Sequence, residues 1–167
     1  MLGSSRRRLL AAATLSAFLL PAAQGQENIA QLEGQFNRES DAVRKVKVLW
    51  KLGDAQFEQI RKETDDGNYT QALRTLEEYR DEVRSAEAAL KATGVDAERK
   101  PGGFKQLQIH VRKSLRQVDQ TIMALPDNQR PPFEAVRRDL LRVDKELIDL
   151  LFPRLPGKNS GKDKPKG

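Results

Sequence analysis

A single histidine, one distant methionine and no cysteine are the main candidates for metal or haem chemistry in this sequence. Di-iron helical proteins use Glu residues together with Glu-x-x-His pairs, but Leu107 stands three residues before His110. A haem held by His110 and Met123 is also excluded, because these two ligands would lie roughly 20 Å apart along one helix. The lack of cysteine removes disulfides, thiolate metal sites and thiol nucleophiles. We therefore predict no bound metal and no cofactor.

Catalytic groups are equally poorly represented. A serine nucleophile would need a histidine beside it on a strained turn, whereas the serines near His110 in the sequence lie within helical patterns. The carboxylate pairs Glu77/Glu78 and Asp81/Glu82 lie off the apolar seam of their segment and have arginines at helical spacing, which is typical of a solvated charged face. We predict that His110 flanks the core or lies on the surface. No catalytic residue is predicted, and the protein is not expected to be an enzyme.

The elements that would position these residues are helices, because apolar residues from Ser40 onward recur at steps of three and four. Period-two alternation does not extend over a useful length, so strands are not expected. Helices are predicted over about residues 40–66, 68–93, 103–125 and 131–152. Each has one apolar seam and a charged remainder, so none should be stable alone. Similar lengths and short turns predict an all-α fold, an antiparallel four-helix bundle.

The predicted seams run from Val43 to Thr64, from Tyr69 to Leu90, from Phe104 to Leu125 and from Phe133 to Leu150. None of the seam positions is a carboxylate, so the core is predicted to contain no acid. Gly53 lies on the first seam, although glycine within a helix costs about 1 kcal/mol relative to alanine. Its position indicates close approach by a bulky neighbour, for which Tyr69 and Tyr79 are the candidates.

Residues at the segment ends have the types that start and stop helices. Ser40 is predicted to cap the first helix, Gly67 to end it in the left-handed conformation, and Gly94 to stop the second helix. Asn68 and Gln71 have the spacing of a capping box for the second helix.

A second apolar stripe lies opposite the main seam of the first long helix. Residues 26–39 form an N-terminal segment, and within it residues 28–37 are predicted to form a short helix that covers the stripe. The alternative is that the stripe is open and binds a partner. The candidate partner-binding residues on this stripe and on a similar one in the last helix are Val48, Leu52, Leu141 and Ile148.

Residues 1–25 are predicted to be a cleaved signal peptide. Arg6–Arg8 precede an apolar stretch, and Ala23 and Gly25 supply small residues before a cut ahead of Gln26. The chain is therefore expected to be exported, to the periplasm or outside the cell, by the secretory or the twin-arginine route.

The positive charge is concentrated at the two ends of the chain. The sequence has 30 Lys and Arg residues against 24 Asp and Glu, but residues 26–152 are close to neutral once both ends are set aside. A nucleic-acid-binding protein needs a basic face on its folded body, so no nucleic-acid partner is predicted. Residues 153–167 are rich in Gly, Pro and Lys and are predicted to be a disordered basic tail, with a weak contact to an anionic envelope surface as one further role.

Residues 67–73, GNYTQAL, resemble the middle of a tetratricopeptide repeat, in which Gly, an aromatic residue and Ala mark the turn and the second helix. The resemblance implies a helical hairpin. Gln56, Ile60 and Glu63 depart from the pattern expected before the glycine, and no second copy follows, so no family is assigned.

Export, a helical body and a scarcity of chemical motifs lead to a hypothesis of function. We expect a small exported helical protein that binds another protein in the cell envelope or outside the cell, through a helix face or the 94–103 loop. The alternatives are a periplasmic chaperone-like or stress protein that binds unfolded clients, and an enzyme or cofactor carrier. The identity of the partner and the oligomeric state stay open.

Overall fold

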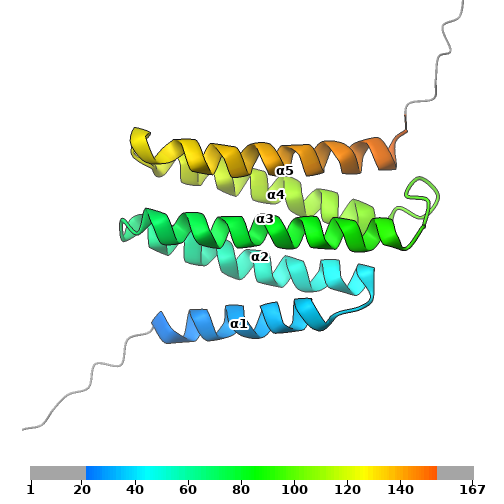
Figure 1. Ribbon diagram of the computed structural model, residues 1–167, viewed down its shortest axis with the longest axis horizontal. Coiled ribbons are helices and arrows are strands. Elements are labelled where there is room, and N and C mark those ends of the chain that lie inside the picture. The colour runs from blue at the N-terminus through cyan, green and yellow to red at the C-terminus, as the bar shows by residue number, and fades with distance from the viewer. Residues whose placement is uncertain (1–21, 154–167) are drawn as a thin grey trace, which may run out of the picture.

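The computed structural model describes residues 22–153, and this part of the chain is all α-helical, as predicted (Figure 1). Within these residues no β-strand is present. The helices are α1 (Ala22–Arg38), α2 (Ala42–Asp65), α3 (Tyr69–Ala92), α4 (Gly102–Ala124) and α5 (Arg130–Leu151), with a short 3₁₀ turn η1 (Asp127–Gln129) before α5. None of these helices is long and apolar enough to span a membrane.

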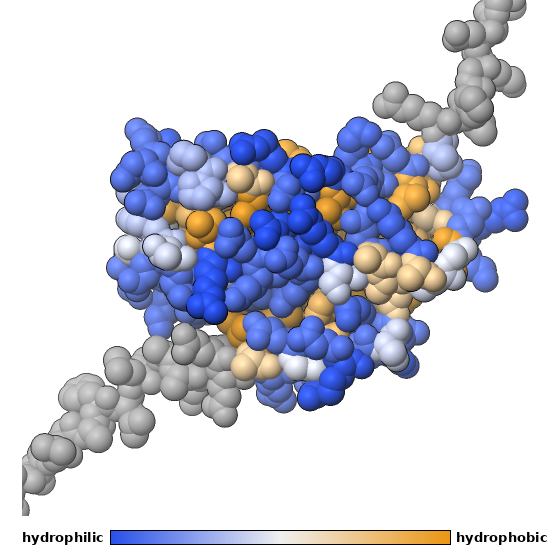
Figure 2. All heavy atoms as spheres, in the orientation of Figure 1, coloured by the Kyte–Doolittle hydropathy of each residue, from blue (hydrophilic) through white to orange (hydrophobic). Residues whose placement is uncertain are grey.

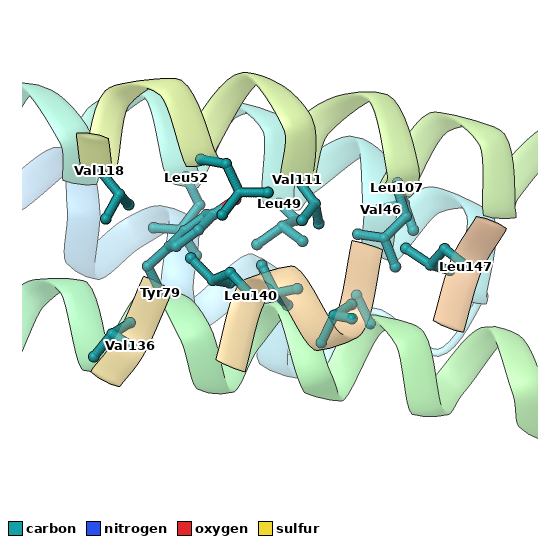
Figure 3. Close-up of a cluster of buried hydrophobic side chains, with 14 of the residues drawn as sticks. Val46, Leu49, Leu52, Tyr79, Leu107, Val111, Val118, Val136, Leu140 and Leu147 are labelled. Atoms are coloured by element: carbon teal, nitrogen blue, oxygen red, sulfur yellow. The ribbon is translucent and has the colours of Figure 1, made fainter. Parts of the chain in front are cut away.

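The four long helices enclose one apolar core. Helix α2 packs on α3 and α4 packs on α5, and further contacts join α2 to α4 and α3 to α5. Because each close pair is joined by a short connection, its two helices run antiparallel. Side chains from these helices interdigitate around Tyr79, as the close-up of the core shows (Figure 3). This packing is consistent with the predicted four-helix bundle.

Helix α1 forms an additional layer on the α2 side, as predicted (Figure 1). It is longer than the predicted helix at 28–37 and begins at Ala22, within the last residues of the predicted leader. Leu52 of α2 is fully buried and Val48 is half-buried, so the second stripe is largely covered, on the helix against which α1 packs. Most of the predicted leader and all but the first residue of the predicted tail lie outside the described residues.

The helix ends confirm part of the sequence interpretation and correct the rest. Gly67 and Gly94 have φ angles of 75° and 67°, in the left-handed region that glycine tolerates. The prediction that Ser40 caps the first long helix is wrong: the Asp41 carboxylate accepts the Arg44 N–H at 2.8 Å. The capping box is wrong too, because the Asn68 side chain makes no capping hydrogen bond.

Candidate functional site

His110 is buried at the centre of the molecule, so the prediction of a flanking or surface position is wrong. It is 1% exposed, and its ring stacks on Trp50 with 5.2 Å between ring centroids. The Tyr79 ring is oriented edge-to-face with the same imidazole, with 5.8 Å between the ring centroids. The spacing already contained a signal for this, because His110 lies three residues after Leu107 and four before Ser114, both of which are buried.

Gly53 provides the space for this aromatic cluster. A Cβ atom at position 53 would lie 2.8 Å from His110 Nε2 and 2.8 Å from Tyr79 Cε2. The predicted close approach by Tyr79 is therefore confirmed, whereas Tyr69 is not one of the closest contacts. The second close neighbour, His110, was missed because it was assigned to the helix surface.

Only some of the polar atoms in this cluster form hydrogen bonds with one another. The Tyr79 hydroxyl lies 2.5 Å from Ser114 Oγ, and the Ser114 hydroxyl also donates to the His110 backbone carbonyl at 3.0 Å. Neither ring nitrogen of His110 has a hydrogen-bond partner within the described residues. Burial lowers the pKa of His110 to about 4, so its imidazole is neutral near pH 7.

This arrangement has the residue types of a catalytic site but lacks access to a substrate. His110, Tyr79 and Ser114 line none of four grooves found in the described part of the chain. Ser114 lies in the middle of α4, where its hydroxyl bonds to the preceding turn instead of pointing to an open position. The cluster therefore fills and orders the core.

The prediction that the core contains no acid is wrong. Glu63, Glu87 and Asp144 are each less than a tenth exposed. They lie at the edges of the seams, where neighbouring helices cover the flanking positions, and each has a polar or basic partner. These contacts are Glu63 with Thr75 at 3.2 Å, Glu87 with Lys91 at 2.7 Å, and Asp144 with Gln108 at 2.9 Å.

Glu82 was expected on a solvated charged face, and this prediction is wrong as well. The residue is half-buried where α3 meets α1, and burial is the main cause that raises its pKa to about 7. The groove at this boundary is lined by Glu33, Asn37, Glu78, Asp81 and Glu82. Across residues 22–153 no group of three or more Asp, Glu or His side chains is placed to hold a metal ion.

The four residues named as a candidate partner surface do not form one surface. On α2, which packs against α1, Leu52 is fully buried and Val48 is half-buried. On α5, Leu141 is 39% exposed and Ile148 is half-buried. The sequence identified apolar stripes correctly, but only the packing of the helices decides that the α2 stripe is largely covered.

A different group of apolar residues is exposed at one end of the molecule. Val95, Leu150 and Pro153 line a groove of about 440 Å³ between the α3–α4 connection and the end of α5. Phe152, which is 71% exposed, directly precedes Pro153. Val43 lies at the same end, because it would contact a Cβ atom at Gly103, the second residue of α4. We call Val43, Val95, Leu150 and Phe152 the apolar end.

Val43 and Leu150 were predicted as seam residues, and the structure corrects both, since they are 40% and 37% exposed. Each lies in a terminal turn of its helix, where neighbouring helices no longer cover the seam. Hydrophilic residues cover most of the face in Figure 2, and apolar residues show mainly between helices and near the end that carries the α3–α4 connection.

Comparison of the chain with protein-family models, with curated proteins and with solved structures gives no significant match.

Proposed function

We propose that this protein is an exported, non-enzymatic binding protein whose partner docks on the apolar end. The observation that carries the proposal is the distribution of exposed apolar side chains. Seven large hydrophobic residues are at least 37% exposed in the described part of the chain, and four of them form the apolar end. Isolated apolar residues on a surface are ordinary, whereas a group beside a groove is typical of an interaction site.

The apolar end has the features of an interface centre. Phe152 supplies an aromatic anchor, a residue type that contributes strongly when it fills a pocket on a partner. The groove beside it has walls from Ala97 and Phe104, which are themselves buried and so hold the groove in shape. A partner that covered these residues would remove apolar area from water, and the association would be favourable.

Charge indicates the chemistry of the partner. The segment 153–167 has a net charge of +4 in the sequence and joins the body at the apolar end. The groove itself carries Asp96 and Asp149 beside Lys91, so the complementary partner presents an apolar pocket to Phe152 and carboxylates to the basic segment rather than to the groove. The predicted leader supports a partner in the cell envelope or outside the cell, and the basic segment would also favour a weak contact with an anionic envelope surface.

The alternatives have less support. A chaperone-like protein would need a broad apolar surface for unfolded clients, but its best candidate stripe on α2 is largely covered. A carrier that bound haem or a metal through its one histidine would need access to His110, which lies in the core.

Photo-crosslinking in the organism that encodes the chain tests the binding site. A photoreactive phenylalanine analogue at position 95 or 152 should give a crosslinked product with one protein. Matched controls at positions 109 and 123 place the same group at exposed apolar residues outside the apolar end. Equal crosslinking at all four positions, or none at 95 and 152, would show that the apolar end is not the docking site. Higher salt should weaken the association.

Export is tested separately by the mass of the processed protein. If residues 1–25 are a cleaved leader, protein recovered from outside the cytoplasm should begin at Gln26. Replacing Ala23 and Gly25 with large residues should prevent processing, because the peptidase accepts only small side chains there. Recovery of the unprocessed chain from the cytoplasm alone would contradict export, but it would not bear on the proposal that the apolar end is the docking site.

A further inference from the structure

Helix α1 is attached to the other helices through one side only. It packs on α2 and borders α3, on the far side of the molecule from α5 (Figure 1). Phe36 is buried, whereas Ile29 and Leu32 are only half-buried against the core. The contact that holds α1 therefore has a modest apolar component, and its polar groups strongly affect its strength.

The polar groups at this contact are mainly carboxyl groups. Glu33 from α1 faces Glu78, Asp81 and Glu82 from α3 across a shared groove that Asn37 also lines. Two of the four acids have basic neighbours on α3: Glu78 pairs with Arg74 at 3.3 Å, and Asp81 pairs with Arg80 at 2.9 Å. Glu33 and Glu82 form no ion pair with a described residue.

The polar side chain that α2 contributes to the same contact is uncharged. Gln56 is 0% exposed, and neither its amide nitrogen nor its amide oxygen has a hydrogen bond of good geometry. The amide lies next to the Glu82 carboxyl and stabilises its ionised form, which offsets part of the effect of burial on the Glu82 pKa. Glu82 Oε2 is also buried without a partner. Docking of α1 thus leaves polar atoms that are shielded from water and poorly satisfied, which weakens the docked state.

The protonation state of Glu82 responds to this environment. Burial, followed by the charges of Glu33, Glu78 and Asp81, raises its pKa to about 7. Burial and Glu78 also raise the pKa of Glu33. Exposure of Glu82 to water would return its pKa towards the ordinary value, so the docked state binds the proton more tightly than the released state does.

We propose that α1 is a pH-sensitive cover on α2 and α3, which is held more tightly while Glu82 is protonated and opens more often when Glu82 and Glu33 are both ionised. Release exposes the face of α2 on which α1 packs. The hinge is the three-residue connection at 39–41, and Asp41 caps α2 without any contribution from α1. Lys45 bonds to the Phe36 carbonyl at 2.9 Å and lies over the Phe36 ring, which keeps the hinge end of α1 in place.

Linkage gives the size of the effect. With a Glu82 pKa of about 7 when docked and about 4.5 when released, the equilibrium constant for opening α1 should increase about tenfold between pH 6 and pH 8. The inference does not rest on the proposed binding function, because the cover lies on a different part of the molecule from the apolar end.

Hydrogen–deuterium exchange of the full chain tests the cover. Opening constants for the amides of residues 29–38 are obtained at pH 6 and pH 8, with each rate divided by the intrinsic rate at that pH, and compared with those of α4. Only α1 should show the tenfold increase. In Glu82→Gln the increase should disappear, because the side chain no longer ionises, and α1 should stay protected at pH 8.

Glu77→Gln is the matched control, since it removes an exposed carboxyl five residues away on the same helix and outside the groove. It should retain the full pH dependence. The proposal is overturned if α1 opens equally at both pH values in the unmodified chain, if α4 opens in parallel with α1, or if Glu77→Gln has the effect expected of Glu82→Gln. A Glu33→Gln variant with a reduced pH dependence would support the role of both carboxyls.

Discussion

Replacement of Gly53 with alanine is expected to destabilise the protein by about 2 kcal/mol, although alanine is the better helix former. The new methyl group would lie 2.8 Å from both His110 Nε2 and Tyr79 Cε2. Both rings are buried and stiff, so they can give way only by displacing other core side chains. Such overpacking costs about 1–3 kcal/mol, and the clash with two rings places this case at the upper end of that range. The gain in helix propensity is only about 1 kcal/mol, so the net effect is a loss of stability.

Gly34→Ala is the matched control for this experiment. Gly34 is also inside a helix, but a Cβ atom there would meet only the flexible end of the Arg38 side chain, at 3.5 Å. We expect this variant to be neutral or stabilised by up to about 1 kcal/mol. Urea unfolding of both variants measures the difference. Equal stability of the two variants would show that position 53 is not tightly packed against the aromatic cluster.

The second large effect concerns pH, and it should be hidden in the unmodified protein because two groups oppose each other. Folding lowers the pKa of His110 from 6.5 to about 4, so the unfolded chain binds more protons between these values. The resulting stability is present above pH 6.5 and is lost as the pH falls towards 4. Between pH 7 and pH 5 this loss is about 2 kcal/mol.

Glu82 acts in the opposite direction. Folding raises its pKa from 4.5 to about 7, so the folded chain binds more protons between these values. The favourable contribution is present below pH 4.5 and is lost as the pH rises through 7. Between pH 7 and pH 5 the protein regains about 2 kcal/mol from this group, which offsets the loss from His110.

Single substitutions should therefore reveal two opposite slopes. In Glu82→Gln the free energy of unfolding should fall by about 2 kcal/mol from pH 7 to pH 5, because the loss from His110 is no longer offset by Glu82. In His110→Leu it should rise by about the same amount, and leucine leaves no partner unsatisfied because both ring nitrogens lack hydrogen bonds within the described residues. Urea unfolding at several pH values, with Glu77→Gln as control, measures each slope. Parallel profiles for the two variants would contradict the assignment.

The sequence by itself determined the all-α class and the positions of the four long helices to within a few residues. The steps of three and four carry this information, because they describe which residues share one face of a helix. Gly67 and Gly94 marked the turns for an equally local reason, since few other residues adopt their backbone conformation. The close approach at Gly53 was also predictable, because a helix rarely tolerates glycine without a packing reason.

Only the tertiary structure decided which positions beside each seam are buried. His110 and Glu82 lie beside the predicted seams of their helices, at positions where burial depends on how closely the next helix approaches and not on the residue's own neighbours in sequence. The same reason explains Val43 and Leu150, which continue their seams but lie beyond the cover of adjacent helices. Helical periodicity gives the direction of a side chain, whereas its exposure is set by the partner helix, and the partner is chosen by the fold as a whole.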